Sequence, residues 1–197
     1  VHDRVLVGFF ARGTHRLVDV EVCPVAHPAI QGFMPGLRAF LGNFRPAHGA
    51  LPQIDLQVDG LGRLWAVFHV LRPLEPSEEG EIRAFLAGAG VAAAFQQGGR
   101  KDTLAPLCGG EEGLPFFSTV GDRRLEIRVP PGGFFQANLA VNHALVGEVA
   151  GVAQWYRGRA VLDLYCGAGD FTLPFGLDAS HAVGIEGYPP AARGAAA

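Results

Sequence analysis

The residues best suited to chemistry lie near the end of the chain, in the run VLDLYCGAGD (Val161–Asp170) and at the acid Glu186. An apolar segment ending in a glycine turn, then a helical segment, then a second apolar segment ending in a carboxylate are typical of a nucleotide-binding sheet. Glycines such as Gly167 let the backbone approach a ligand closely. An acid about twenty residues further on can accept hydrogen bonds from both hydroxyls of a ribose. The pattern therefore predicts an adenosine-binding site.

The turn itself distinguishes between adenosine compounds. A dinucleotide fingerprint reads GxGxxG, whereas here the third glycine is absent and the acid Asp170 follows the turn. An ionised acid would repel a pyrophosphate at the helix N-terminus. S-adenosylmethionine has no phosphate and bears a sulfonium cation, so an acid is tolerable or helpful beside it. The turn favours this methyl donor, and an NAD-dependent dehydrogenase is the alternative from another class.

The composition is that of an ordinary globular protein. The 197 residues are 49% hydrophobic and 18% charged, with a formal net charge of -3, so the whole chain has no electrostatic footprint for nucleic acid. The three cysteines contain no CxxC pair, which argues against a disulfide framework and a self-contained zinc site. Without an apolar run of about 18 residues or a leader, we expect a monomeric cytoplasmic protein with no membrane partner. The first residue, Val1, and the alanine-rich end lead us to expect a chain cut at both ends.

The apolar periodicity predicts the elements that must position the site. Hairpins are expected within residues 5–22, 51–71 and 116–129, and a strand over 91–97 followed by a loop over 98–102. Helices are expected over 28–44 and after a capping Ser77, the second with Ile82, Phe85 and Leu86 facing inward. Residues 1–130 should therefore form a hairpin-rich α+β central domain. After a boundary at the PPGG segment, residues 131–197 should supply a helix through Trp155 and the start of a Rossmann-like α/β sheet. Its apolar faces would be left uncovered, so we expect this second segment to be poorly ordered alone.

Taken together, these motifs resemble the RNA uracil-5-methyltransferase family, which is class I and S-adenosylmethionine-dependent. The resemblance is carried by FFQAN (Phe134–Asn138), LDLYCGAGDFTLP (Leu162–Pro174) and GIEG (Gly184–Gly187). The upstream run VDVEVCP (Val18–Pro24) is similar to the ribosomal branch, which methylates a uridine of 23S rRNA. The resemblance covers nearly the whole chain and implies RNA as the partner. The tRNA branch of the same family is the close alternative.

The resemblance also implies roles for single residues. The side chains or backbone that would contact S-adenosylmethionine are those of Gln136, Tyr165, Gly167, Asp170 and Glu186. The family usually has Asn where this chain has Asp170, and an acid accepts hydrogen bonds but does not donate them. Cys23 matches the last of four cysteines that hold a [4Fe-4S] cluster in the ribosomal branch. The other three are absent here, so a cluster would depend on residues that precede this chain.

The chemistry of that family is covalent. A cysteine thiolate adds to C6 of a flipped-out uracil, C5 takes the methyl group, and a base removes the C5 proton before the cysteine leaves. The resemblance places the nucleophile and the base beyond residue 197, so we assign no catalytic residue and expect this chain alone to be inactive. Cys166 lies in the cofactor turn and is not assigned as the nucleophile. A noncatalytic nucleotide- or RNA-binding α/β domain is the remaining alternative.

Overall fold

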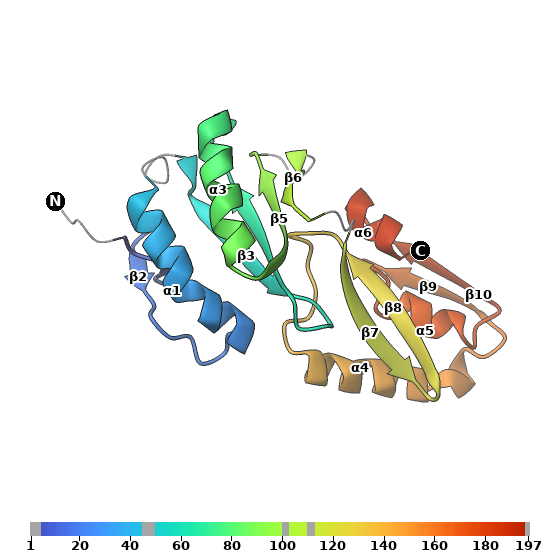
Figure 1. The fold of residues 1–197 in the computed structure, drawn as a ribbon. Coiled ribbons are helices and arrows are strands. Elements are labelled where there is room, and N and C mark those ends of the chain that lie inside the picture. The colour runs from blue at the N-terminus through green and yellow to red at the C-terminus, as the bar shows by residue number, and fades with distance from the viewer. Residues whose placement is uncertain (1–4, 45–49, 100–102, 110–112, 196–197) are drawn as a thin grey trace. The chain divides into compact units, whose positions relative to one another are not determined.

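The computed structural model describes residues 5–44, 50–99, 103–109 and 113–195. Contacts divide the chain into two compact units (Figure 1). The first comprises residues 1–58 and 62–110, and the second comprises residues 59–61 and 111–197. No helix in the described ranges is long and apolar enough to cross a membrane. The loop that the sequence indicated at residues 98–102 lies mostly outside the described residues.

The first unit contains a four-stranded sheet in the order β3-β4-β5-β6. These strands are β3 (Gln53–Val58), β4 (Leu64–His69), β5 (Val91–Gln97) and β6 (Ala105–Cys108). The outer pairs are antiparallel, as expected for the predicted hairpin of β3 and β4. The central pair β4 and β5 is parallel, because helix α3 (Pro76–Gly88) crosses between them. The sequence patterns predicted both strands but not their parallel pairing.

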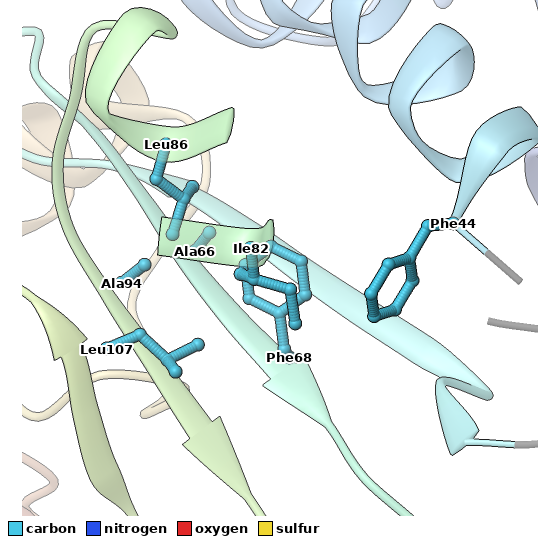
Figure 2. Packing of buried hydrophobic residues seen from close by; sticks show 7 residues of the cluster. All are labelled: Phe44, Ala66, Phe68, Ile82, Leu86, Ala94 and Leu107. Atoms are coloured by element: carbon cyan, nitrogen blue, oxygen red, sulfur yellow. The ribbon is translucent and has the colours of Figure 1, made fainter. Parts of the chain in front are cut away.

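One face of this sheet is covered by helices. Helix α1 (Pro28–Asn43) follows the small antiparallel hairpin of β1 (Gly8–Phe10) and β2 (Leu17–Asp19). Figure 2 shows the main cluster of buried side chains between α3, the sheet and the residue after α1, which consists of Phe44, Ala66, Phe68, Ile82, Leu86, Ala94 and Leu107. The two α3 residues are four apart and lie on one helix face. The predicted inward face of this helix is therefore confirmed.

The predicted start of α3 is wrong by two residues. The residue at the N-cap is Glu75, and Ser77 lies inside the first turn, because Pro76 has the fixed φ that suits the first helical position. Glu78 then accepts a hydrogen bond from the Glu75 N–H (2.8 Å) and two from Arg72 (2.7 and 2.5 Å). These bonds to Arg72 and Glu75 lower the pKa of Glu78 to about 2.

The second unit contains an antiparallel hairpin and a parallel pair of strands. The hairpin joins β7 (Leu114–Val120) and β8 (Arg123–Val129), and α4 (Leu139–Gly151) contacts β7. A short 3-10 helix (Ala153–Trp155) leads to β9 (Ala160–Leu164), α5 (Thr172–Gly176), β10 (His181–Ile185) and α6 (Pro189–Gly194). Strands β9 and β10 are parallel neighbours, which confirms the strand–helix–strand unit indicated by the sequence.

The hairpin of β7 and β8 groups with the residues that follow it. The Phe116 and Phe135 rings stack with centroids 3.9 Å apart, and a ring nitrogen of His143 lies 2.7 Å from the Phe117 carbonyl oxygen. The sequence predicts a boundary at Pro130, after this hairpin, whereas the compact unit begins at residue 111. Whether residues 1–130 and 131–197 fold as independent domains is a separate question, and that division stays a prediction.

Candidate cofactor site

The turn after β9 has an unusual backbone. Gly167 and Gly169 have positive φ angles of 57° and 94°, which glycine adopts at little cost. Tyr165 also has a positive φ, of 62°, and within the described residues no other non-glycine residue does. A bulky side chain in this conformation is a true outlier, and such strain clusters at ligand-binding sites. The ring gains little from packing, since Tyr165 is 90% exposed.

Glu186 connects the end of β10 to this turn. Its Oε2 accepts a hydrogen bond from the Gly167 N–H (2.9 Å), and its Oε1 accepts one from the Tyr188 N–H (2.7 Å). The N–H groups of Tyr188 and Gly167 hold the pKa of Glu186 below its ordinary value, because they stabilise the ionised form. Each carboxylate oxygen has a further lone pair to accept another hydrogen bond. The acid is thus fixed and ionised beside the glycine turn.

Close packing beneath the turn depends on a glycine in β10. A Cβ added to Gly184 would lie 2.6 Å from the sulfur of Cys166 and 3.1 Å from the Thr172 hydroxyl oxygen. The Cys166 N–H also donates to the Ile185 carbonyl (3.1 Å). Burial raises the pKa of the Cys166 thiol, so the sulfur stays protonated at neutral pH and is a poor nucleophile.

Asp170 is held by a residue that the sequence analysis did not single out. The side-chain amide of Asn142, on α4, donates to Asp170 Oδ1 at 3.1 Å. Burial raises the pKa of Asp170, and this hydrogen bond opposes the shift. Asn142 is 1% exposed, and its Oδ1 has no hydrogen-bond partner within the described residues. One signal in the sequence could have indicated this role. Asn142 is a polar residue in an apolar helix, and it lies four positions before the fully buried Val146 and so on the same helix face.

Gln136 is the predicted site residue that the structure leaves apart from the turn. It is exposed in the segment before α4 and makes no hydrogen bond with any described residue. Its neighbour Asn138 caps α4 by accepting from the Val141 N–H (3.1 Å). Through α4 this segment is tied to the turn, because the same helix carries Asn142. The structure therefore joins Gly167 to Glu186 and Asn142 to Asp170, but shows no direct contact to Gln136.

Cys23 lies in a turn after β2, partly exposed, and its carbonyl accepts from the Ala26 N–H (3.1 Å). Across the described ranges, no group of three or more His, Cys, Asp or Glu side chains is arranged to hold a metal ion. The residues present here do not fit an iron-sulfur cluster by themselves, since such clusters are held by four thiolates.

The family model described as tRNA (Uracil-5-)-methyltransferase matches residues 111–186, which include the turn and Glu186. The chain is 32% identical, over 94% of its length, to the 23S rRNA (uracil(1939)-C(5))-methyltransferase RlmD of Acidovorax sp. (strain JS42), of which it covers 37%. It is 35% identical, over 93% of its length, to the protein of the same description from Paracidovorax citrulli (strain AAC00-1), of which it covers 36%. The chain thus spans less than half the length of these curated relatives.

Among solved structures, the chain is similar to the Pyrococcus abyssi tRNA (uracil-54, C5)-methyltransferase in complex with S-adenosyl-L-homocysteine. The TM-score is 0.66 at 17% sequence identity, over 92% of this chain and 46% of that one. At this identity the likeness concerns the fold alone.

The parallel strand–helix–strand unit with its glycine turn and the carboxylate after the second strand, together with the likeness in fold to this solved structure, confirms the predicted Rossmann-like α/β fold class. Within that class, the chain is a homologue of the RNA uracil-5-methyltransferases, as its motifs indicated.

Proposed function

We propose that this chain binds S-adenosylmethionine within an enzyme that methylates C5 of a uridine in 23S rRNA. The observation that carries the proposal is the fixed, ionised Glu186, held by the Gly167 N–H at 2.9 Å. A carboxylate in this position suits the two hydroxyls of a ribose. The open glycine turn beside it has room for a ligand, since nothing lies within 4 Å of a Cβ placed on Gly167.

The remaining predicted residues fit the parts of the same ligand. Tyr165 presents an exposed aromatic face for packing against the sugar or the methionine portion. Asp170 supplies negative charge, and the exposed amide of Gln136 is able to donate and to accept. S-adenosylmethionine supplies an electrophilic methyl group on a sulfonium when bound. These residues would hold and orient that ligand.

The RNA substrate is proposed from the relatives, since they are described as 23S rRNA enzymes. The family model carries a tRNA description, so tRNA is the second candidate. The covalent step through a cysteine adduct needs a nucleophile and a base that we assign to no residue of this chain. Cys23 would supply one ligand of a [4Fe-4S] cluster, and three further thiolates would have to come from outside this chain.

Titration calorimetry of the protein with S-adenosylhomocysteine tests the cofactor assignment. We expect Glu186→Ala to weaken binding roughly 10- to 100-fold, because hydrogen bonds to a charged group contribute about 1.5–3 kcal/mol each. Glu148→Ala is the matched control, since Glu148 is an exposed acid on α4, and it should bind like the wild type. Absence of binding by the wild type, or equal binding by all three proteins, would contradict the proposal.

The choice of RNA is tested on the longer protein that contains this chain. Methyl transfer from labelled S-adenosylmethionine should modify 23S rRNA transcripts and leave tRNA transcripts unmodified. Modification of tRNA alone would move the assignment to the second candidate.

A further inference from the structure

Three carboxylates surround the turn after β9, and their hydrogen-bond partners are uncharged. The Thr172 hydroxyl donates to Asp163 Oδ2 at 2.6 Å, two backbone N–H groups donate to Glu186, and the Asn142 amide donates to Asp170. Within the described residues, none of these three acids takes part in an ion pair. The turn therefore carries a concentration of negative charge that no Lys or Arg of the described part neutralises.

The ionised form of Asp170 is disfavoured by its surroundings. The residue is partly buried, and burial of a carboxylate is unfavourable unless the charge is compensated. Removal of water raises the pKa of Asp170, and the Asn142 amide and the imidazole of His143 oppose that shift. A cationic ligand beside Asp170 would supply a permanent counter-charge.

The residue that holds Asp170 also points to a ligand. Asn142 is 1% exposed, and its nitrogen is directed at Asp170 while its Oδ1 has no donor within the described residues. A buried amide oxygen without a donor costs free energy. The hydrogen bond from Asn142 thus has a cost, and it keeps the partly buried Asp170 carboxylate oriented beside the glycine turn.

We infer that Asp170, positioned by Asn142, makes the cofactor pocket select by charge between the methyl donor and its product. This inference rests on the proposed function. S-adenosylmethionine has a net charge of +1, from its sulfonium, its ammonium and its carboxylate. When the methyl group leaves, the sulfur keeps the bonding electron pair and becomes a neutral thioether. S-adenosylhomocysteine therefore lacks the attraction between the sulfonium and the acidic turn, and it binds more weakly than the methyl donor does.

The test measures dissociation constants of the longer protein for three ligands by calorimetry. These are S-adenosylmethionine, S-adenosylhomocysteine and sinefungin, an analogue in which an amine-bearing carbon replaces the methylated sulfur and keeps a positive charge. Asp170→Asn removes the negative charge and keeps the shape of the side chain. We expect both cationic ligands to bind roughly tenfold more weakly, which is the scale of one charge pair in a partly exposed pocket. Binding of S-adenosylhomocysteine should change little.

Two further variants separate charge from structure. Glu148→Gln removes one negative charge from the exposed surface of α4 and should leave the ratio of the three dissociation constants unchanged. Asn142→Ala removes the donor that orients Asp170, and we expect it to reduce the preference for the cationic ligands without abolishing it. If Asn142→Ala does not fold, the comparison of Asp170→Asn with Glu148→Gln decides alone.

The outcomes of this test are distinct from those of the proposed function. Wild-type protein that binds none of the three ligands would overturn the proposed function and this inference with it. Binding of all three ligands with a ratio that Asp170→Asn leaves unchanged, or a uniform weakening of all three, would overturn the charge selectivity alone.

Discussion

Tyr165 has a left-handed backbone conformation, with φ of 62°, and a side chain that is 90% exposed. For a residue with a Cβ this conformation costs about 1–2 kcal/mol relative to the ordinary regions. Because the ring is exposed, its packing within this chain offsets little of that free energy. Strained backbone is typical of residues that contact ligands. The strain at Tyr165 therefore supports a role for its ring in binding a ligand.

Substitution of Tyr165 should separate strain from binding. Tyr165→Gly relieves the strain, and Tyr165→Ala removes the ring but keeps the strain. We expect the glycine variant to have a free energy of unfolding about 1 kcal/mol above that of the alanine variant, measured by urea denaturation. Both should bind S-adenosylhomocysteine more weakly than the wild type. A glycine variant less stable than the alanine variant would show that the backbone of Tyr165 is unstrained.

At the scale of elements, the site depends on how closely β10 packs on the turn that follows β9. The two strands are parallel neighbours, and the sulfur of Cys166 occupies the space beside Gly184. A side chain at residue 184 would push the turn away from β10 and so from Glu186. The first glycine of the GIEG motif is therefore needed for packing. Glu186, two residues later, has lone pairs left with which to accept hydrogen bonds from a ligand.

We expect Gly184→Ala to destabilise the second unit by about 1–3 kcal/mol, the usual cost of overpacking. Thermal or urea denaturation followed by circular dichroism measures this. Gly187→Ala is the control, because nothing lies within 4 Å of a Cβ at that glycine. Cys166→Ala combined with Gly184→Ala should recover part of the loss, since it removes the atom that would lie 2.6 Å away. Equal effects at residues 184 and 187 would contradict the packing explanation.

At the scale of the molecule, the second unit exposes apolar strand residues. Leu162 and Leu164 of β9 are each 59% exposed, and Val183 and Ile185 of β10 are 40% and 53% exposed. Parallel sheets are normally covered on both faces. The chain spans less than half the length of its relatives, and we propose that residues outside this sequence cover these strands.

The hairpin of β7 and β8 contributes to the order of this unit. Residues 134–197 alone would lose the stacking of Phe116 on Phe135 and the contact of Gly194 with the Arg128 carbonyl. We therefore expect residues 134–197 to show no cooperative thermal transition by circular dichroism, and residues 111–197 to be more ordered. Within residues 111–197, Phe116→Ala should reduce that order. A cooperative transition of residues 134–197 alone would contradict this prediction.

The local elements and the chemistry of the turn were predictable from the order of the amino acids. Apolar periodicity predicted α1 and the inward face of α3, because burial of one helix face leaves a period of 3.6 in the residues. Short apolar runs predicted strands β5, β9 and β10. The glycine turn, Asp170 and Glu186 lie close together in the chain, so their motif and its family resemblance were visible without coordinates. Strand β6 was missed because Pro106 argues against a strand, although an edge strand tolerates it.

The contacts between residues far apart in the chain became visible in the folded protein. The parallel pairing of β4 with β5, the grouping of the β7 and β8 hairpin with the second unit, and the hydrogen bond of Asn142 to Asp170 join residues far apart in the chain. Periodicity reports whether a side chain is buried, but not against which partner. The acid at residue 170 was therefore readable from the sequence, whereas the buried amide that orients it became visible only when α4 was packed against the turn.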